Sequence, residues 1–173
     1  MTLDELNNVS WQTANDWFTQ TCAARRWSEK MTNGRPYNSL EAVNDAAQRH
    51  WATMEKEDFL EAFAAHPMIG DINSLRSKFA NTRSMAANEQ QGASVADEQT
   101  LSSLRDHNLT YQEKHGFIFI IFASGLDADT MLNALKARIN NSTNTEIQNA
   151  AVEQLKITQL RIVKGLANQQ GVL

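Results

Sequence analysis

Apolar residues recur every three or four positions along most of this 173-residue chain, and this spacing constrains the fold more than any other feature. On an α-helix, residues three and four positions apart lie on one face, so the pattern predicts amphipathic helices that pack by their apolar sides. Only two prolines, Pro36 and Pro67, interrupt the chain. The sequence therefore predicts an all-α fold.

The expected helices begin and end at recognisable residues. Ser10 and Ser39 can each cap a helix N-terminus, and Asp127 opens a further helix. A helix over about residues 57–65 must end before Pro67, because the residue before a proline is pushed out of the α region. Two more helices are predicted, one ending at Gly116 and a long last one from Thr145. The expected inward positions are Trp11, Ala14, Phe18, Cys22, Leu40, Val43, Ala47, Trp51, Met54, Leu101, Leu104, Asn108, Tyr111, Met131, Leu135 and Ile139.

One segment departs from the helical spacing, because residues 116–123 are apolar without interruption. By composition it fits either a buried strand or a buried helical segment. No second candidate strand is evident, so a lone strand would have no sheet to join. We expect a buried extended or helical piece inside a single-domain compact helical bundle that spans residues 1–173.

Composition excludes several classes of protein. Apolar residues make up 42% and charged residues 21%, as in soluble globular proteins. A net charge of -4 without a basic stripe predicts no nucleic-acid partner. No apolar run approaches the ~20 residues of a membrane helix, so no membrane partner is expected. Asp4 and Glu5 stand where a signal peptide would be basic, which favours a cytoplasmic location.

Metal and cofactor motifs are missing from the sequence. None of the four histidines, His50, His66, His107 and His115, has the spacing of a metal site, and Cys22 is the single cysteine. There is no glycine-rich phosphate loop and no nucleophile elbow. We therefore expect no metal site, with Cys22 packing as a small hydrophobe.

His66 is the first candidate for catalysis. Pro67 stiffens the backbone after it, so the imidazole projects from a rigid turn and is suited to proton transfer near neutral pH. On the local sequence alone, a histidine that merely ends a helix before a proline is the simpler interpretation.

Glu89 and Gln90 form the second candidate. A carboxylate beside an amide can orient a histidine and bind a polar heterocycle, although a polar helix segment has the same composition. The third candidate is Arg161, which a helical wheel places on the apolar side of the last helix. A cation there needs a partner, either a protein carboxylate or an anionic or carbonyl-rich ligand, and the sequence leaves both open.

Four motifs together resemble the OHCU decarboxylase family, whose substrate is 2-oxo-4-hydroxy-4-carboxy-5-ureidoimidazoline. They occur in the family's order, at nearly its spacing, and span almost the whole chain. They are His66-Pro67-x-Ile69-Gly70, Glu89-Gln90-x-Gly92-Ala93, Tyr111-x-x-Lys114-x-Gly116-Phe117-x-Phe119, and Leu160-Arg161-Ile162.

The resemblance implies an all-α homodimer that decarboxylates this small molecule to (S)-allantoin in urate breakdown, without a cofactor. It implies catalytic roles for His66 and Glu89, and backbone contacts from the stretch that begins at Phe119. The substrate contacts it implies are Pro67, Ala86, Ala87, Asn88, Glu89, Gln90, Phe119, Ile120, Ile121, Phe122, Ala123 and Arg161.

The sequence departs from the family in two places. Ala86 stands where the family often has serine, which removes one side-chain hydrogen bond, and the loop between Gly70 and Glu89 looks slightly longer than usual. Two other functions stay open. A helical adaptor would tie Arg161 to a protein carboxylate, and a hydrolase of another ureide would position a water molecule.

Overall fold

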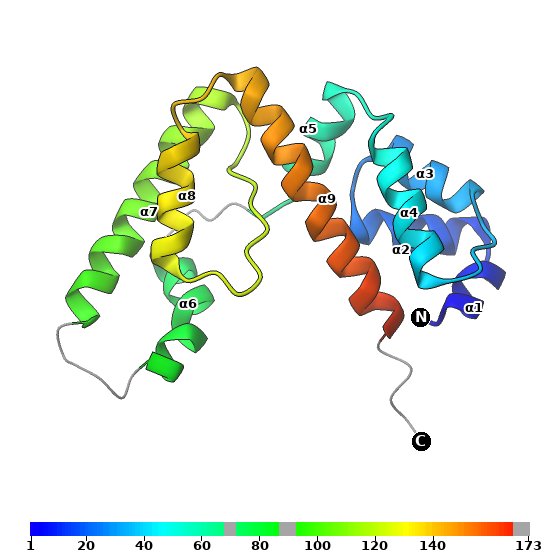
Figure 1. Cartoon of the computed structure of the whole chain (residues 1–173), viewed down its shortest axis with the longest axis horizontal. Helices are drawn as coiled ribbons and strands as arrows, with labels where there is room; N and C mark the ends of the chain where they lie inside the picture. The colour runs from blue at the N-terminus through cyan, green and yellow to red at the C-terminus, as the bar shows by residue number, and fades with distance from the viewer. Residues whose placement is uncertain (68–71, 87–92, 168–173) are drawn as a thin grey trace. The chain divides into compact units, whose positions relative to one another are not determined.

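The computed structural model describes the backbone of residues 1–67, 72–86 and 93–167, and the side chains of residues 1–67, 72–79 and 98–166. All regular structure in these residues is helical, which confirms the all-α prediction (Figure 1). The helices are α1 (Leu3–Asn8), α2 (Trp11–Thr21), α3 (Arg25–Asn33), α4 (Leu40–Trp51), α5 (Lys56–Ala64), α6 (Ile72–Ala86), α7 (Ala93–His115), α8 (Ala128–Arg138) and α9 (Thr143–Ala167).

The chain forms two compact units. The terminal unit comprises Met1–Ala65 and the chain from Asn149 onward, and the central unit comprises His66–Gln148. The chain passes from one unit to the other after α5 and again within α9. A single domain over residues 1–173 stays a prediction.

The terminal unit is built on aromatic side chains. Helix α3 packs against α2, α4 and α5. Phe18 and Trp27 are fully buried and meet edge to face, with ring centroids 6.1 Å apart. Two buried indoles hold the unit together by hydrogen bonds, since Trp27 donates to the Ala47 carbonyl at 3.1 Å and Trp51 to the Ala151 carbonyl at 2.9 Å. The second bond ties the C-terminal part of α9 into this unit.

Most of the predicted helix ends are confirmed. The side chains of Ser10, Ser39 and Asp127 each accept a backbone N–H from the first turn of their helix. Helix α5 ends at Ala64, two residues before His66, as Pro67 requires. Gly116 ends α7 with a φ of 81°, a conformation that favours glycine.

Several sequence predictions were wrong in detail. Trp11 lies outside the core, 45% exposed, and its indole donates to the Asn33 side chain at 2.7 Å. The last helix begins at Thr143 rather than Thr145. Much of the supposed loop between Gly70 and Glu89 is helix α6, whose Leu75 is fully buried.

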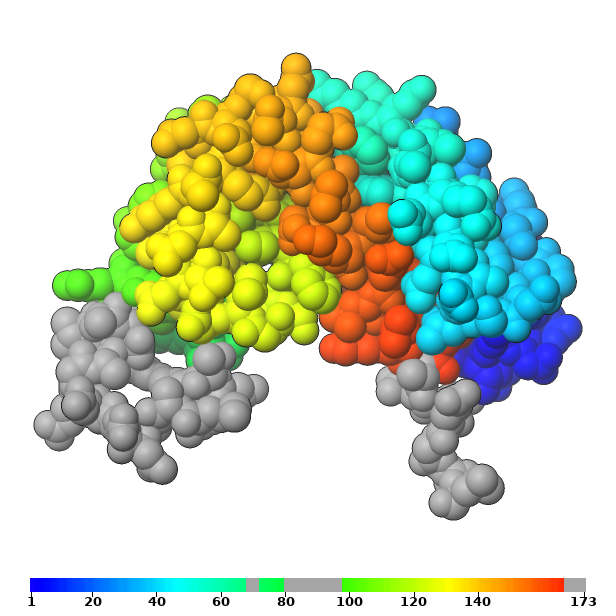
Figure 2. Space-filling view, in the orientation of Figure 1, coloured from blue at the N-terminus to red at the C-terminus, as the bar shows by residue number. Residues whose placement is uncertain are grey.

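The central unit contains α6, α7 and α8. Helix α7 packs against α6 and α8, and Arg76 forks two nitrogens onto the Glu98 carboxylate at 2.8 and 2.7 Å to link α6 to α7. Residues 118–123, here called the extended segment, run from the end of α7 toward the start of α8 (Figure 1). The atoms of this segment and of α8 adjoin on the face shown in Figure 2. None of the helices within the described residues is long and apolar enough to cross a membrane.

Candidate functional site

His66 lies at the start of the central unit, just after the last turn of α5. Ala65, the C-cap of α5, has helical backbone angles, and its N–H is bonded to the Ala62 carbonyl at 3.4 Å. The His66 side chain is partly buried and Pro67 is exposed. A partly buried imidazole next to an exposed proline keeps contact with both protein and solvent, as a proton-transfer group needs.

The second predicted motif lies mostly beyond the described residues. Ala86 is the last residue of α6, and its side chain is outside the described set. Ala87, Asn88, Glu89 and Gln90 fall in the stretch 87–92, which is outside it altogether. The pairing of Glu89 with His66 therefore stays a prediction.

The extended segment forms neither helix nor strand. Of the two forms expected for this apolar run, extended or helical, the helical form is therefore wrong. Phe119 and Ile120 are buried, and Ile121, Phe122 and Ala123 are partly buried. Across the described part of the chain, the N–H groups of residues 118–121 donate to no protein acceptor. Backbone N–H groups need acceptors, so this segment can offer hydrogen bonds to the oxygens of a ligand.

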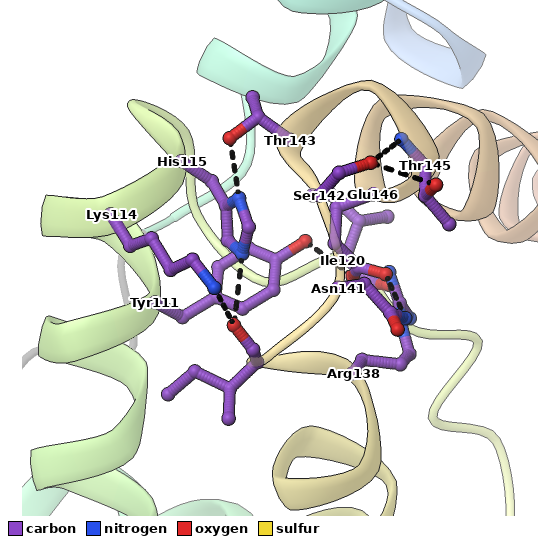
Figure 3. A network of polar contacts seen from close by, with 11 residues as sticks. Tyr111, Lys114, His115, Ile120, Arg138, Asn141, Ser142, Thr143, Thr145 and Glu146 are labelled. Carbon is purple, nitrogen blue, oxygen red and sulfur yellow. Dashed lines mark hydrogen bonds and ion pairs between the residues drawn. The ribbon is translucent and has the colours of Figure 1, made fainter.

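A buried polar cluster lies beside the extended segment (Figure 3). Glu146 is fully buried at the start of α9 and accepts hydrogen bonds from the Tyr111 hydroxyl at 2.7 Å and the Arg138 Nε at 2.9 Å. Asn141 donates to its second oxygen at 3.0 Å. Arg138 also donates to the Ile120 carbonyl at 2.8 Å, which connects the cluster to the segment.

The electrostatics of this cluster keep its donors and acceptor in fixed roles. Burial, helped by the hydrogen bond to Glu146, raises the pKa of Tyr111 well above its ordinary value of 10.0. The hydroxyl therefore keeps its proton and donates a hydrogen bond to the carboxylate. A buried carboxylate with three donors, one of them a guanidinium, is satisfied, so Glu146 has a structural rather than a reactive environment.

Sequence reasoning missed Arg138 and Glu146. In the sequence, Arg138 is indistinguishable from an ordinary cation in the last turn of α8, where the helix dipole favours positive charge. Glu146 had one weak signal, because it lies four residues before the buried Ala150 and so shares the apolar face of α9.

Arg161 lies in the terminal unit, and the prediction that its helix side would bury it was wrong. The side chain is exposed, because the buried stripe of this part of α9 is narrow and Arg161 borders it. The stripe consists of Ala151, Gln154, Thr158, Ile162 and Leu166.

The guanidinium of Arg161 is anchored on one side. It donates to the Thr21 carbonyl at 3.2 Å, and no carboxylate of the described residues forms an ion pair with it. The side chain is exposed, so the buried protein carboxylate that the adaptor hypothesis requires is not found among the described residues. That Arg161 belongs to the same site as His66, which lies in the other unit, stays a prediction.

Cys22 lies next to Thr21 and confirms the expected packing as a small hydrophobe, since it is fully buried. Burial raises the pKa of its thiol from the ordinary 9.0 to about 11, although a hydrogen bond at Ala24 and the charge of Arg161 act in the opposite direction. The folded protein therefore holds this proton more tightly than the unfolded chain. The contribution of Cys22 to the free energy of unfolding is complete below pH 9 and is lost as the pH rises toward 11.

This environment predicts an unreactive thiol. At pH 8 the pKa shift alone lowers the thiolate fraction about 10²-fold, so a thiol-reactive dye should label the native protein at least that much more slowly than the urea-unfolded chain. The single cysteine makes the signal unambiguous. Equal labelling rates in the two states would contradict the burial of Cys22.

Among the described residues, no group of three or more histidine, cysteine, aspartate or glutamate side chains is arranged to hold a metal ion. The polar cluster around Glu146 fits this finding, because two cationic or hydroxyl donors already occupy the carboxylate. The absence of a cofactor stays a prediction.

Comparisons with known proteins agree with one another. A family model described as OHCU decarboxylase matches residues 7–163. The uric acid degradation bifunctional protein TTL of Arabidopsis thaliana is 34% identical over 95% of this chain and 51% of the relative, so the chain spans about half of that protein. A 2-oxo-4-hydroxy-4-carboxy-5-ureidoimidazoline decarboxylase of Haloferax volcanii is 25% identical over 98% of both chains. A crystal structure of OHCU decarboxylase in the presence of (S)-allantoin superposes with a TM-score of 0.69 and 33% identity, over 89% of this chain and 99% of that chain.

Proposed function

We propose that this chain, which belongs to the OHCU decarboxylase family, converts 2-oxo-4-hydroxy-4-carboxy-5-ureidoimidazoline to (S)-allantoin and CO2 in urate breakdown. The observation that carries the proposal is the similarity to the decarboxylase crystallised in the presence of (S)-allantoin, which extends over 99% of that chain. The relatives from Arabidopsis and Haloferax are named for urate degradation and for this decarboxylation.

The chemistry suits a protein that supplies only polar side chains and backbone groups. When the bond to the carboxylate breaks, its electron pair moves toward the adjacent C=N of the ring and CO2 leaves. A proton must then reach the ring carbon on one face to give one enantiomer. The protein has to hold the ring, stabilise the developing negative charge and deliver that proton.

We assign these tasks to the predicted site residues. His66 transfers the proton, and Glu89 orients its imidazole. Arg161 and Gln90 hold the ring, and the N–H groups of the extended segment bind ring or ureide oxygens. The exposed donors of Arg161 and the unused N–H groups of residues 118–121 support this assignment.

The same resemblance supports three further proposals about the intact protein. It acts on a small molecule, it assembles as a homodimer, and it works in the cytoplasm. The acidic net charge of -4 supports the proposed lack of a nucleic-acid partner.

The test follows allantoin by circular dichroism, starting from freshly oxidised urate. Spontaneous decay gives a racemate, which has no signal, so the proposed enzyme should produce the (S) signal at a rate proportional to protein concentration. Extensive treatment with a chelator should leave the rate unchanged. The absence of any signal would favour the adaptor hypothesis, and consumption of added allantoin would favour the hydrolase.

A further inference from the structure

Arg138 makes three different contacts from the last turn of α8. Its side chain is only 15% exposed, its Nε is bonded to Glu146 at 2.9 Å, and an Nη is bonded to the Ile120 carbonyl at 2.8 Å. Its guanidinium also lies over the Phe119 ring, 4.5 Å from the centroid. One partly buried cation thus contacts two consecutive residues of the extended segment.

Glu146 fixes the direction in which Arg138 points. The carboxylate is itself held by the Tyr111 hydroxyl and the Asn141 amide, so it cannot follow the arginine if that side chain moves (Figure 3). The Tyr111 ring packs edge to face on Phe119, with centroids 5.2 Å apart. Phe119 therefore contacts the two side chains, Tyr111 and Arg138, that Glu146 binds.

The bond from Arg138 to the Ile120 carbonyl determines more than the position of one oxygen. A trans peptide unit is planar, and its C=O and N–H point in opposite directions. Because the Ile120 carbonyl points to Arg138, the N–H of Ile121 points away from Arg138. That N–H donates to no acceptor among the residues that the structure describes.

The extended segment lacks the support that a sheet would give. A strand in a sheet is held by a ladder of backbone hydrogen bonds, whereas residues 118–121 make no backbone-to-backbone hydrogen bond within the described part of the chain. Side chains must therefore supply the rigidity. Arg138 provides one such contact, a hydrogen bond to the Ile120 carbonyl of this segment.

We infer that Arg138 is a positioning residue, which aims the backbone N–H of Ile121 at the substrate by holding the Ile120 carbonyl, with Glu146 and Tyr111 as its support. The inference rests on the proposed decarboxylation. It assigns no contact between Arg138 and the substrate. The chemical class that this N–H recognises is a carbonyl or carboxylate oxygen of the ureidoimidazoline.

The test compares Arg138→Lys with the wild-type protein. Lysine keeps the charge but lacks the planar fork that reaches Glu146 and Ile120 together. We expect kcat to fall about tenfold, with a smaller change in KM. The reason is that a misdirected N–H donor weakens the binding of the transition state, where negative charge develops, more than the binding of the substrate. Phe119 and Ile120 are buried, so burial rather than hydrogen bonding slows the exchange of their amides. Hydrogen exchange at these two residues should become severalfold faster in the variant, and exchange in the middle of α7 should stay unchanged.

Two further variants make the result decisive. Lys136→Gln removes an exposed cation from the same turn of α8 and should behave as wild type in both measurements. Tyr111→Phe removes only the hydroxyl bonded to Glu146, so it should shift exchange and kcat in the same direction as Arg138→Lys, by less. Tyr111→Phe also tests the positioning role if Arg138→Lys fails to fold.

The outcomes separate this inference from the proposed function. Absence of turnover in the wild-type protein would overturn the proposed function, and the exchange measurement would then decide alone whether Arg138 holds the segment. Unchanged exchange and unchanged kcat in Arg138→Lys, with an active wild-type protein, would overturn the positioning role and leave the decarboxylation standing.

Discussion

Replacement of His66 by asparagine is expected to lower turnover by about 10²-fold or more, because general acid–base catalysis by a positioned side chain contributes at least that factor. Asparagine is similar in size and polarity but cannot exchange a proton near neutral pH. The measurement is the initial rate of (S)-allantoin formation by circular dichroism. Far-UV spectra should show unchanged helix content, since α5 ends before His66.

The control for this prediction is a second histidine of the same unit. His107 lies on α7, partly buried, with its Nδ1 2.7 Å from the Ser103 carbonyl one turn earlier. His107→Asn should keep nearly full activity, because that contact is local to the helix. If His66→Asn also keeps nearly full stereospecific activity, His66 only terminates a helix.

Replacement of Arg161 by lysine is expected to weaken (S)-allantoin binding by about ten- to 100-fold. Hydrogen bonds to a charged group are worth roughly 1.5–3 kcal/mol, and an ammonium cannot reproduce the planar fork of a guanidinium. Turnover should fall as well, because the ring is held less rigidly. Calorimetric titration with (S)-allantoin measures the affinity, and Lys164→Gln, an exposed cation one turn further along α9, should bind as wild type.

Thermal melting distinguishes this role from the adaptor hypothesis. That hypothesis requires a buried carboxylate as the partner of Arg161. Arg161→Ala would leave this carboxylate buried without a partner and lower the free energy of unfolding by roughly 3–5 kcal/mol. The exposed side chain has one bond, to the Thr21 carbonyl, so we expect a loss of about 1 kcal/mol. A large melting loss, with no effect of allantoin on either protein, would remove Arg161 from the proposed site.

The sequence determined those features that depend on interactions between near neighbours. The side chains of Ser10, Ser39 and Asp127 each accept a hydrogen bond from the backbone N–H three residues ahead. The capping residue and the start of its helix can therefore be predicted from one short stretch of sequence. Gly116 ends α7 for an equally local reason, its positive φ. The apolar run that follows could be recognised as buried, because composition alone sets it apart.

Tertiary structure decided the features that join distant parts of the chain. Glu146 binds Tyr111, 35 positions earlier in the chain, and Arg138, 8 positions earlier. Arg138 in turn binds the Ile120 carbonyl, 18 positions before it, so no short stretch of sequence contains the whole cluster. The helical wheel placed Arg161 on the apolar side of the last helix, but the width of the buried stripe depends on which helices pack there. A periodic pattern thus fixes the direction in which a side chain points, whereas burial and pairing depend on the neighbours that the fold brings to it.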